Sequence, residues 1–354
     1  MGDWRDNLRR VRAYTPGEQP KLDDIVKLNT NENPYPPAPA VREMLAWFDT
    51  DVLRKYPAPD AYKLVKALSD EYEVPENMIF PGVGSDDVLG MAFLACFNSD
   101  KPVFFPDITY SFYDVWCELF NIKYETKKLD PSFMIVKEDY MTENGGIVIA
   151  NPNAPTSIEM DPSELEEIIA ANKDSVVIVD EAYVDFAEHT VLPLVKKYDN
   201  LLVVRTFSKS RSMAGVRIGF AVGSPELIAA INNVKNSYNS YTMNTLSIEA
   251  GVASLSDKAY FEETKQKILR TRRHMANRLR ELGFYYPKSS ANFLFVTHNR
   301  IPAKIIFQEL RNRRIYVRYF DKPLIDNYLR ITVGTEEELD KLVAALERIV
   351  SKYV

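Results

Sequence analysis

Short apolar runs alternate with longer stretches of helical periodicity between about residues 75 and 225. This rhythm is typical of repeated βαβ units, whose buried parallel strands read as nearly continuous apolar segments. We therefore expect an α/β fold, in which helices cover both faces of a mostly parallel sheet. The predicted strands span residues 102–105, 122–125, 146–150, 176–179, 201–205 and 217–222.

The C-terminal part of the chain has a different pattern. A charged stretch at 257–282 has helical spacing and predicts a connecting helix. Thr335 and Glu338 form a capping pair before a final amphipathic helix. Residues 303–311 favour another helix. Strands are expected at 292–296, 315–318 and 329–333, so this part predicts a smaller α+β domain.

At 354 residues, the chain is long enough to form more than one domain. Its first 30 residues or so are rich in proline and charge and show no strong period, which is typical of an arm that lies on other parts of a structure. The expected division is an N-terminal arm at 1–29, a large domain at 30–255 and a small C-terminal domain at 256–354.

Charge and cysteine content exclude several classes of partner. The net charge of -6 gives no general attraction to nucleic acid or anionic lipid. The N-terminus lacks the apolar core of a signal peptide, and no apolar run approaches the length of a membrane span. Cys96 and Cys117 lie in apolar surroundings that suit reduced thiols, and no histidine joins them in a metal-ligand spacing. We expect a cytoplasmic protein that binds small molecules and no metal.

Two predicted strand ends carry the candidate chemistry. Lys209 follows the apolar run that ends near Val204, and Asp180 directly follows Val179. Ligands of open α/β sheets bind beyond the carboxyl ends of the strands, and a buried carboxylate there needs a cationic partner. Considered alone, Lys209 would be interpreted as a surface lysine, and Asp180 as a carboxylate that caps the next helix. Their occurrence together favours a shared site.

A glycine-containing turn at 81–87 supplies a candidate anion site, because it opens an apolar helix at 88–97. Glycines let a phosphate approach the free amides of a helix start. The turn lacks the Walker lysine and the full dinucleotide pattern, so a nucleotide-binding protein is a weaker alternative. Asp86 and Asp87 must turn their carboxylates away from a phosphate. Backbone amides, with Ser208 and Arg217, then suit a phosphate monoester.

From about Asn29 to Gly334, these segments resemble, in order, the fold-type I pyridoxal-phosphate aminotransferases. Within that family the chain is most similar to the histidinol-phosphate aminotransferases. The similarity to this subgroup rests on Leu28-Asn29-Thr30-Asn31-Glu32-Asn33-Pro34-Tyr35, Arg54-Lys55-Tyr56-Pro57 and Leu329-Arg330-Ile331-Thr332-Val333-Gly334. The resemblance implies pyridoxal 5'-phosphate as cofactor and a homodimer with shared active sites.

The resemblance also implies a role for each matching residue. Lys209 would form the Schiff base, Asp180 would pair with the pyridine nitrogen and Tyr183 would bond the ring oxygen; these three are the expected catalytic residues. Tyr110 would stack on the ring. Cofactor contacts are expected from Gly84, Ser85, Asp86, Tyr110, Asn153, Thr206, Ser208, Arg217 and, across the dimer, Tyr56. Substrate contacts are expected from Asn31, Arg318 and Arg330.

One segment departs from the family pattern. The usual Asn-Asn-Pro-Thr-Gly is replaced by Asn153-Ala154-Pro155-Thr156-Ser157. Alanine therefore stands where the family has an asparagine that bonds the ring oxygen. Asn153, a water molecule or Tyr183 alone would then supply that contact.

The activity that the resemblance implies is reversible amino transfer from L-histidinol phosphate to 2-oxoglutarate, giving imidazole acetol phosphate and glutamate, in histidine biosynthesis. An aromatic amino-acid aminotransferase and a threonine-phosphate decarboxylase are alternatives on the same scaffold. A cofactor-binding transcriptional regulator is an alternative of another class. The short N-terminal arm leaves no room for the helix-turn-helix domain that such a regulator needs.

Overall fold

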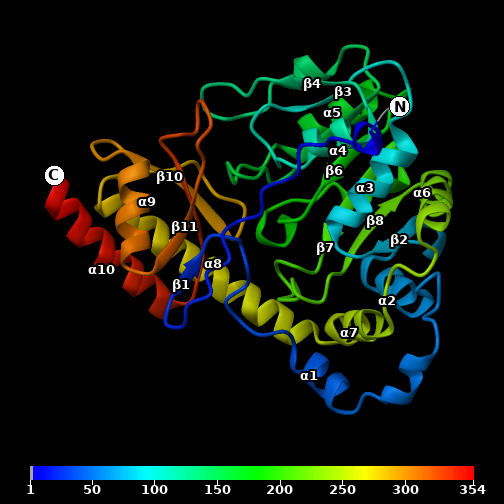
Figure 1. Ribbon diagram of the computed structural model, residues 1–354, viewed down its shortest axis with the longest axis horizontal. Helices are drawn as coiled ribbons and strands as arrows, with labels where there is room; N and C mark the ends of the chain where they lie inside the picture. Colours follow the sequence, from blue (N-terminus) through cyan, green and yellow to red (C-terminus); the bar gives the residue numbers. More distant parts are fainter. Residues whose placement is uncertain (1–2) are drawn as a thin grey trace.

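A computed structural model describes residues 3–354 and arranges them around two β-sheets of different size. Figure 1 shows the two sheets on opposite sides of the molecule, each with its own helices. The long helix α8 (Lys258–Glu281) extends from the smaller sheet to α7 (Thr245–Ser256) under the larger one. Within residues 3–354, no helix is long and apolar enough to cross a membrane.

The larger sheet contains seven strands in the order β2-β8-β7-β6-β5-β3-β4. They are β2 (Ile79–Gly82), β3 (Val103–Pro106), β4 (Tyr124–Lys127), β5 (Gly146–Ala150), β6 (Val177–Asp180), β7 (Leu201–Thr206) and β8 (Gly219–Gly223). Strands β3 to β7 pair in parallel, whereas β8 lies antiparallel between β7 and β2. The six predicted runs all form strands close to their expected bounds, which confirms the mostly parallel sheet.

Two differences from the predicted strands have local causes. The sequence pattern does not predict β2, because its short run ends in Pro81 and Gly82, which are rare in strands. Strand β8 begins at Gly219, later than expected. Arg217 has a left-handed backbone with φ of 59°, so it belongs to the turn before the strand.

Helices cover both faces of the larger sheet, as β6 demonstrates. Val177 and Val179 belong to one apolar core, which includes side chains of α2 and α5. Ile178 points the other way, into a second core with side chains of α3, α4 and α6. This alternation follows from the pleat of a strand. The helices are α1 (Pro39–Ala46), α2 (Tyr62–Tyr72), α3 (Ser85–Cys96), α4 (Tyr113–Phe120), α5 (Pro162–Ala171) and α6 (Pro225–Tyr238).

The smaller sheet has the order β1-β11-β12-β10-β9. Its strands are β1 (Val26–Leu28), β9 (Phe284–Tyr285), β10 (Phe293–His298), β11 (Ile315–Tyr319) and β12 (Leu329–Thr332). The helices α8, α9 (Ala303–Asn312) and α10 (Glu336–Tyr353) pack against it in a separate apolar core. The predicted capping box of Thr335 and Glu338 is present at the start of α10, which confirms that helix start.

Strand β1 places part of the N-terminal segment in the smaller sheet. Val26–Leu28 pairs in parallel with Ile315–Val317, so this piece of the predicted arm is an edge strand. Three residues carry no readable period, and the sequence therefore does not predict the strand. The division into 1–29, 30–255 and 256–354 stays a prediction, which the existence of two separate sheets supports.

Candidate active site

The parallel strands of the larger sheet end at one edge, and polar residues gather there. Ala150, Asp180 and Val204 are cross-strand neighbours in β5, β6 and β7, so the loops that follow them begin side by side. They border a cavity that opens to solvent. Nine residues predicted from the sequence line it: Ser85, Asp86, Tyr110, Asp180, Tyr183, Thr206, Ser208, Lys209 and Arg217.

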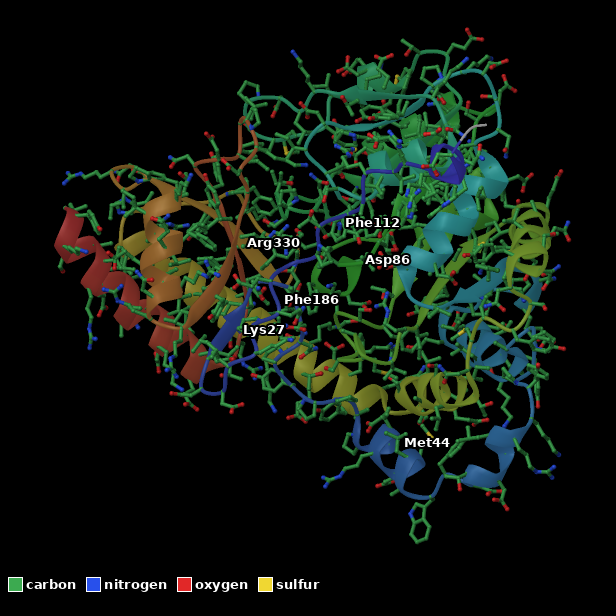
Figure 2. The ribbon with its side chains drawn as sticks, viewed as in Figure 1. Lys27, Met44, Asp86, Phe112, Phe186 and Arg330 are labelled. Carbon is green, nitrogen blue, oxygen red and sulfur yellow. The ribbon has the colours of Figure 1, made fainter. Side chains whose placement is uncertain are left out.

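A second cavity adjoins the first, because Tyr110, Ala154, Tyr183 and Lys209 line both. The second cavity is lined by all three predicted substrate-binding residues, Asn31, Arg318 and Arg330, and also by Tyr14 and Gly17 of the N-terminal segment. Asp86 lies on the side of the larger sheet and Arg330 on the side of the smaller one (Figure 2). The combined space therefore lies between the two sheets and is large enough for a cofactor and a substrate.

Lys209 lies at the junction of the two cavities. Its Nζ donates to the carbonyl of Thr30 at 3.3 Å and lies 5.7 Å from the ring centre of Tyr183. Asn33 fixes the backbone here, since its Nδ2 donates to the carbonyls of Lys209 and Ser210 at 3.0 Å each. Among the described residues, Lys209 forms no ion pair with a carboxylate. Its amine is thus available to a ligand from either cavity.

Asp180 is a buried carboxylate with two donors and no cationic partner among residues 3–354. Its Oδ2 accepts from the Tyr113 hydroxyl at 2.8 Å, and its Oδ1 accepts from the Ala182 amide at 3.1 Å. Burial raises the pKa of Asp180 to about 6, although both donors oppose the rise. A cationic ring nitrogen would complete this site.

Tyr113 is a residue of this site that sequence reasoning missed. It begins α4, is fully buried and contacts Asp180 directly. Burial raises the pKa of Tyr113 well above its usual range, so its hydroxyl stays protonated and remains a donor. The available signal was its position one helical turn after Tyr110, which places both side chains near the same strand ends.

The start of α3 forms a cradle for an anion. Gly84 precedes the helix with φ of 84°, and no side chain caps the helix. A Cβ atom at Gly84 would lie 2.4 Å from Nη2 of Arg217, and a Cβ atom at Gly219 would lie 2.4 Å from the Ser85 nitrogen. Glycine is therefore required at both positions, because Arg217 and the start of α3 approach them closely. The free amides of the helix start and the guanidinium of Arg217, which lines the cavity with Ser85 and Ser208, suit a phosphate.

Both carboxylates of this turn have hydrogen-bond partners, and the charge of Asp86 is paired with the guanidinium of Arg217 beside the cradle. Asp87 accepts from the Val83 amide at 2.9 Å. Asp86 accepts from the Tyr110 hydroxyl at 2.8 Å and from Arg217 at 3.3 Å. The residues of the first cavity thus fit pyridoxal phosphate: an amine, a buried carboxylate and a phosphate cradle surround one space.

Three predicted cofactor contacts do not line the cavities: Gly84, which directly precedes the lining residue Ser85, and Asn153 and Tyr56. Asn153 lines neither cavity, because its amide is bonded to Ile108, Thr109 and Thr156. Its contact with the ring oxygen therefore stays a prediction, and the hydrogen bonds of its amide within the protein favour the alternatives of a water molecule or Tyr183 alone. Tyr56 also lines neither cavity; it is 83% exposed and stacks on Tyr241 with ring centres 4.7 Å apart.

Arg318 and Arg330 form a pair of like charges in the second cavity. They are direct cross-strand partners in β11 and β12. Nη2 of Arg330 donates to the Asn29 carbonyl at 3.0 Å, while its buried Nε has no hydrogen-bond partner. Burial lowers the pKa of Arg330. Adjacent cations with an unsatisfied donor favour the binding of an anionic group between them.

Comparison with known proteins agrees with this geometry. Residues 23–346 match the family model described as aminotransferase class I and II. The chain is 47% identical to a histidinol-phosphate aminotransferase of Lactococcus lactis, over 99% of this chain and 97% of that protein. It is also 47% identical to a histidinol-phosphate aminotransferase of Chromohalobacter salexigens, over 98% of both chains.

Solved structures have the same fold. A histidinol-phosphate aminotransferase from Clostridium acetobutylicum matches with a TM-score of 0.86 at 20% identity, over 93% of this chain and 100% of that one. A histidinol-phosphate aminotransferase from Sinorhizobium meliloti, in complex with pyridoxal-5'-phosphate, matches with a TM-score of 0.84 at 23% identity, over 93% and 92% of the two chains. The cavity, the family match and these relatives lead to one conclusion: the chain belongs to the aminotransferase class I and II family.

Proposed function

We propose that this protein is a pyridoxal-phosphate enzyme that transfers the amino group of L-histidinol phosphate to 2-oxoglutarate in histidine biosynthesis. The observation that carries the proposal is a single cavity that joins the amine of Lys209, the buried carboxylate of Asp180 and the helix start at Ser85. Relatives that are 47% identical over nearly the whole chain bear the name of this activity.

The roles of the residues follow from ordinary acid–base chemistry. Pyridoxal phosphate, when bound, supplies a ring that withdraws electrons and makes the α-proton of the substrate acidic. Asp180, as a carboxylate, would pair with the ring nitrogen of the bound cofactor. The amine of Lys209, which lines both cavities, would hold the cofactor and act as the base for the proton of the substrate carbon. One lysine therefore binds the cofactor and moves the proton.

Arg318 and Arg330 support an anionic substrate in the second cavity. Their guanidinium groups suit a phosphate of the amino donor and a carboxylate of the acceptor, since both anions accept paired hydrogen bonds. Aromatic amino acids carry a carboxylate as well, and threonine phosphate carries both anions. An aromatic aminotransferase and a threonine-phosphate decarboxylase thus remain the alternatives that the substrate test must separate.

We also propose a cytoplasmic homodimer whose active sites are shared. Tyr56 is exposed, and so are the nearby apolar side chains of Val52, Leu53, Tyr62 and Tyr241. Exposed apolar groups that gather on one face favour a protein interface. A mixing experiment tests the sharing: Lys209→Ala and Tyr56→Ala protomers, each inactive alone, should regain activity together, because one site of each hybrid dimer is intact. Hybrid dimers without activity would contradict shared sites.

The substrate proposal is tested by mixing the cofactor-bound protein with histidinol phosphate and following the absorbance of the cofactor. Conversion to the pyridoxamine form, reversed by 2-oxoglutarate, is the expected result. Lys209→Arg is the control, since it keeps a cation but should block the conversion. Conversion by phenylalanine or another amine, with none by histidinol phosphate, would replace the substrate and keep the reaction class.

A further inference from the structure

A chain of hydrogen bonds links the smaller sheet to Tyr183 through Asn31. Nδ2 of Asn31 donates to the Tyr183 hydroxyl oxygen at 2.9 Å, and Oδ1 of Asn31 accepts from Thr332 Oγ1 at 3.0 Å. We propose that Asn31 is a positioning residue, which holds the hydroxyl proton of Tyr183 toward the ring oxygen of the cofactor. This inference rests on the proposed binding of pyridoxal phosphate and gives Asn31 a different role from the predicted substrate contact.

Thr332 fixes which end of the Asn31 amide faces Tyr183. Its Oγ1 accepts the backbone N–H of Asn31 at 3.0 Å, so the hydroxyl proton of Thr332 is left to donate to Oδ1. With Oδ1 turned to Thr332, the NH₂ group faces Tyr183. The amide therefore presents a donor to Tyr183, and the Tyr183 oxygen is the acceptor.

The Tyr183 proton must then point elsewhere. Among residues 3–354, no acceptor receives a hydrogen bond from the Tyr183 hydroxyl, and Tyr183 lines both cavities. A phenolic group that accepts one bond and has no internal acceptor offers its proton to a ligand in that space. An anionic ring oxygen is the best acceptor that the proposed cofactor provides.

The backbone of Asn31 is held as firmly as its side chain. Asn31 is 1% exposed, and its φ of 55° lies in the left-handed region that asparagine tolerates better than most residues. Asn292 Nδ2 donates to the Asn31 carbonyl at 3.1 Å. Thr332 is the last residue of β12, and Asn292 directly precedes β10. The smaller sheet therefore sets the position of the Asn31 amide.

The contact between Asn31 and Tyr183 matters more in this chain than it would if a second side chain also donated to the ring oxygen. Ala154, which stands where the family has an asparagine, packs against Tyr183 with Ala291 and Phe293 and offers no side-chain donor. The amide of Asn153 is bonded to its own loop and to Ile108. Among residues 3–354, Tyr183 is therefore the side-chain donor that we assign to the ring oxygen, and the direction of its hydroxyl depends on Asn31.

The test replaces Asn31 by aspartate, which has the same shape but can only accept. The hydroxyl of Tyr183 would then donate to the new carboxylate and leave the ring oxygen. A donor at that oxygen stabilises its negative charge most when the neighbouring imine nitrogen has lost its proton. Asn31→Asp should thus raise the pH midpoint of the cofactor absorbance by about one pKa unit, since a charged hydrogen bond is worth about that much.

A double variant separates this effect from the added charge. Tyr183→Phe should raise the midpoint by a similar amount, and Asn31→Asp in the Tyr183→Phe background should raise it no further. Thr332→Val, which lets the amide turn, should shift the midpoint in the same direction, with Thr332→Ser as its matched control. These variants also serve if Asn31→Asp does not fold.

The outcomes distinguish the two levels of the proposal. An unchanged midpoint in Asn31→Asp and Thr332→Val, or additive shifts in the double variant, would overturn the role of Asn31 while the cofactor remains bound. Wild-type protein that shows no pyridoxal absorbance at any pH would overturn the proposed function itself. The absorbance titration needs no substrate. It therefore tests the role of Asn31 even if the protein does not turn over histidinol phosphate.

Discussion

Replacing Asp180 by asparagine removes a charge that burial disfavours in the cofactor-free protein. Burial raises the pKa of the Asp180 carboxyl from 3.8 to about 6, against the opposing hydrogen bonds of Tyr113 and Ala182. The folded state therefore holds the carboxyl proton more tightly than the unfolded state does. The contribution of Asp180 to the free energy of unfolding therefore falls as the pH rises from the unfolded pKa through 6, and this loss is complete above it.

The size of this loss follows from the two pKa values. The rise from 3.8 to about 6 corresponds to about 3 kcal/mol, because one pKa unit is worth about 1.36 kcal/mol. Roughly 2 kcal/mol of it falls between pH 4.5 and 7.5. Asparagine keeps the shape and does not titrate. The difference in free energy of unfolding between Asp180→Asn and wild type should thus shift by roughly 2 kcal/mol in favour of the variant from pH 4.5 to 7.5. The altered hydrogen bonds of asparagine add a cost that does not change with pH.

Urea unfolding at a fixed protein concentration, followed by circular dichroism from pH 4.5 to 7.5, measures the difference. Asp100→Asn is the matched control, since the Asp100 side chain is fully exposed and its removal should leave the pH profile parallel to wild type. Bound pyridoxal phosphate should reverse the order, because the ring nitrogen then partners the carboxylate. Parallel profiles for wild type and Asp180→Asn would refute the reasoning.

Three further changes test other parts of the site. Tyr113→Phe should raise the pKa of Asp180 by about one further unit and steepen the same unfolding profile; an unchanged slope contradicts it. Gly84→Ala adds a Cβ at positive φ, 2.4 Å from a side-chain nitrogen of Arg217. Fluorescence titration should therefore show that pyridoxal phosphate binds about tenfold more weakly or worse. Gly215→Ala, whose Cβ meets no atom within 4 Å, is the control and should bind the cofactor normally. Arg330→Gln should raise the KM for histidinol phosphate by about tenfold in steady-state assays. A KM equal to that of wild type would contradict anion binding by Arg330.

The sequence predicts the larger sheet and the central pair of the site for the same reason. Buried parallel strands are continuous apolar runs, and their carboxyl ends meet at one edge. Asp180 and Lys209 each follow such a run, so their entry into one cavity follows from topology. The turn at Gly84 can also be predicted from the sequence, because its left-handed backbone conformation favours glycine.

The remaining contacts depend on packing that no local pattern encodes. Tyr113 is one of 20 tyrosines, and its burial under Asp180 becomes visible only when α4 lies on the sheet. Asn153 was one of the groups expected to contact the ring oxygen, but its amide donates to the Ile108 carbonyl and to Thr156. Strand β1 is too short for a period, and its partner lies near the other end of the chain.

The pairing of Val26–Leu28 with Ile315–Val317 has a consequence for how the protein is made. A ribosome releases β1 long before its partner exists, so residues 26–28 cannot pair until Ile315–Val317 has been synthesised. Thr332, which bonds Asn31, emerges later still. Contacts this distant in sequence form slowly. The larger sheet can therefore assemble during translation, while the loop beside Lys209 gains its final shape only after residues 315–332 have been synthesised.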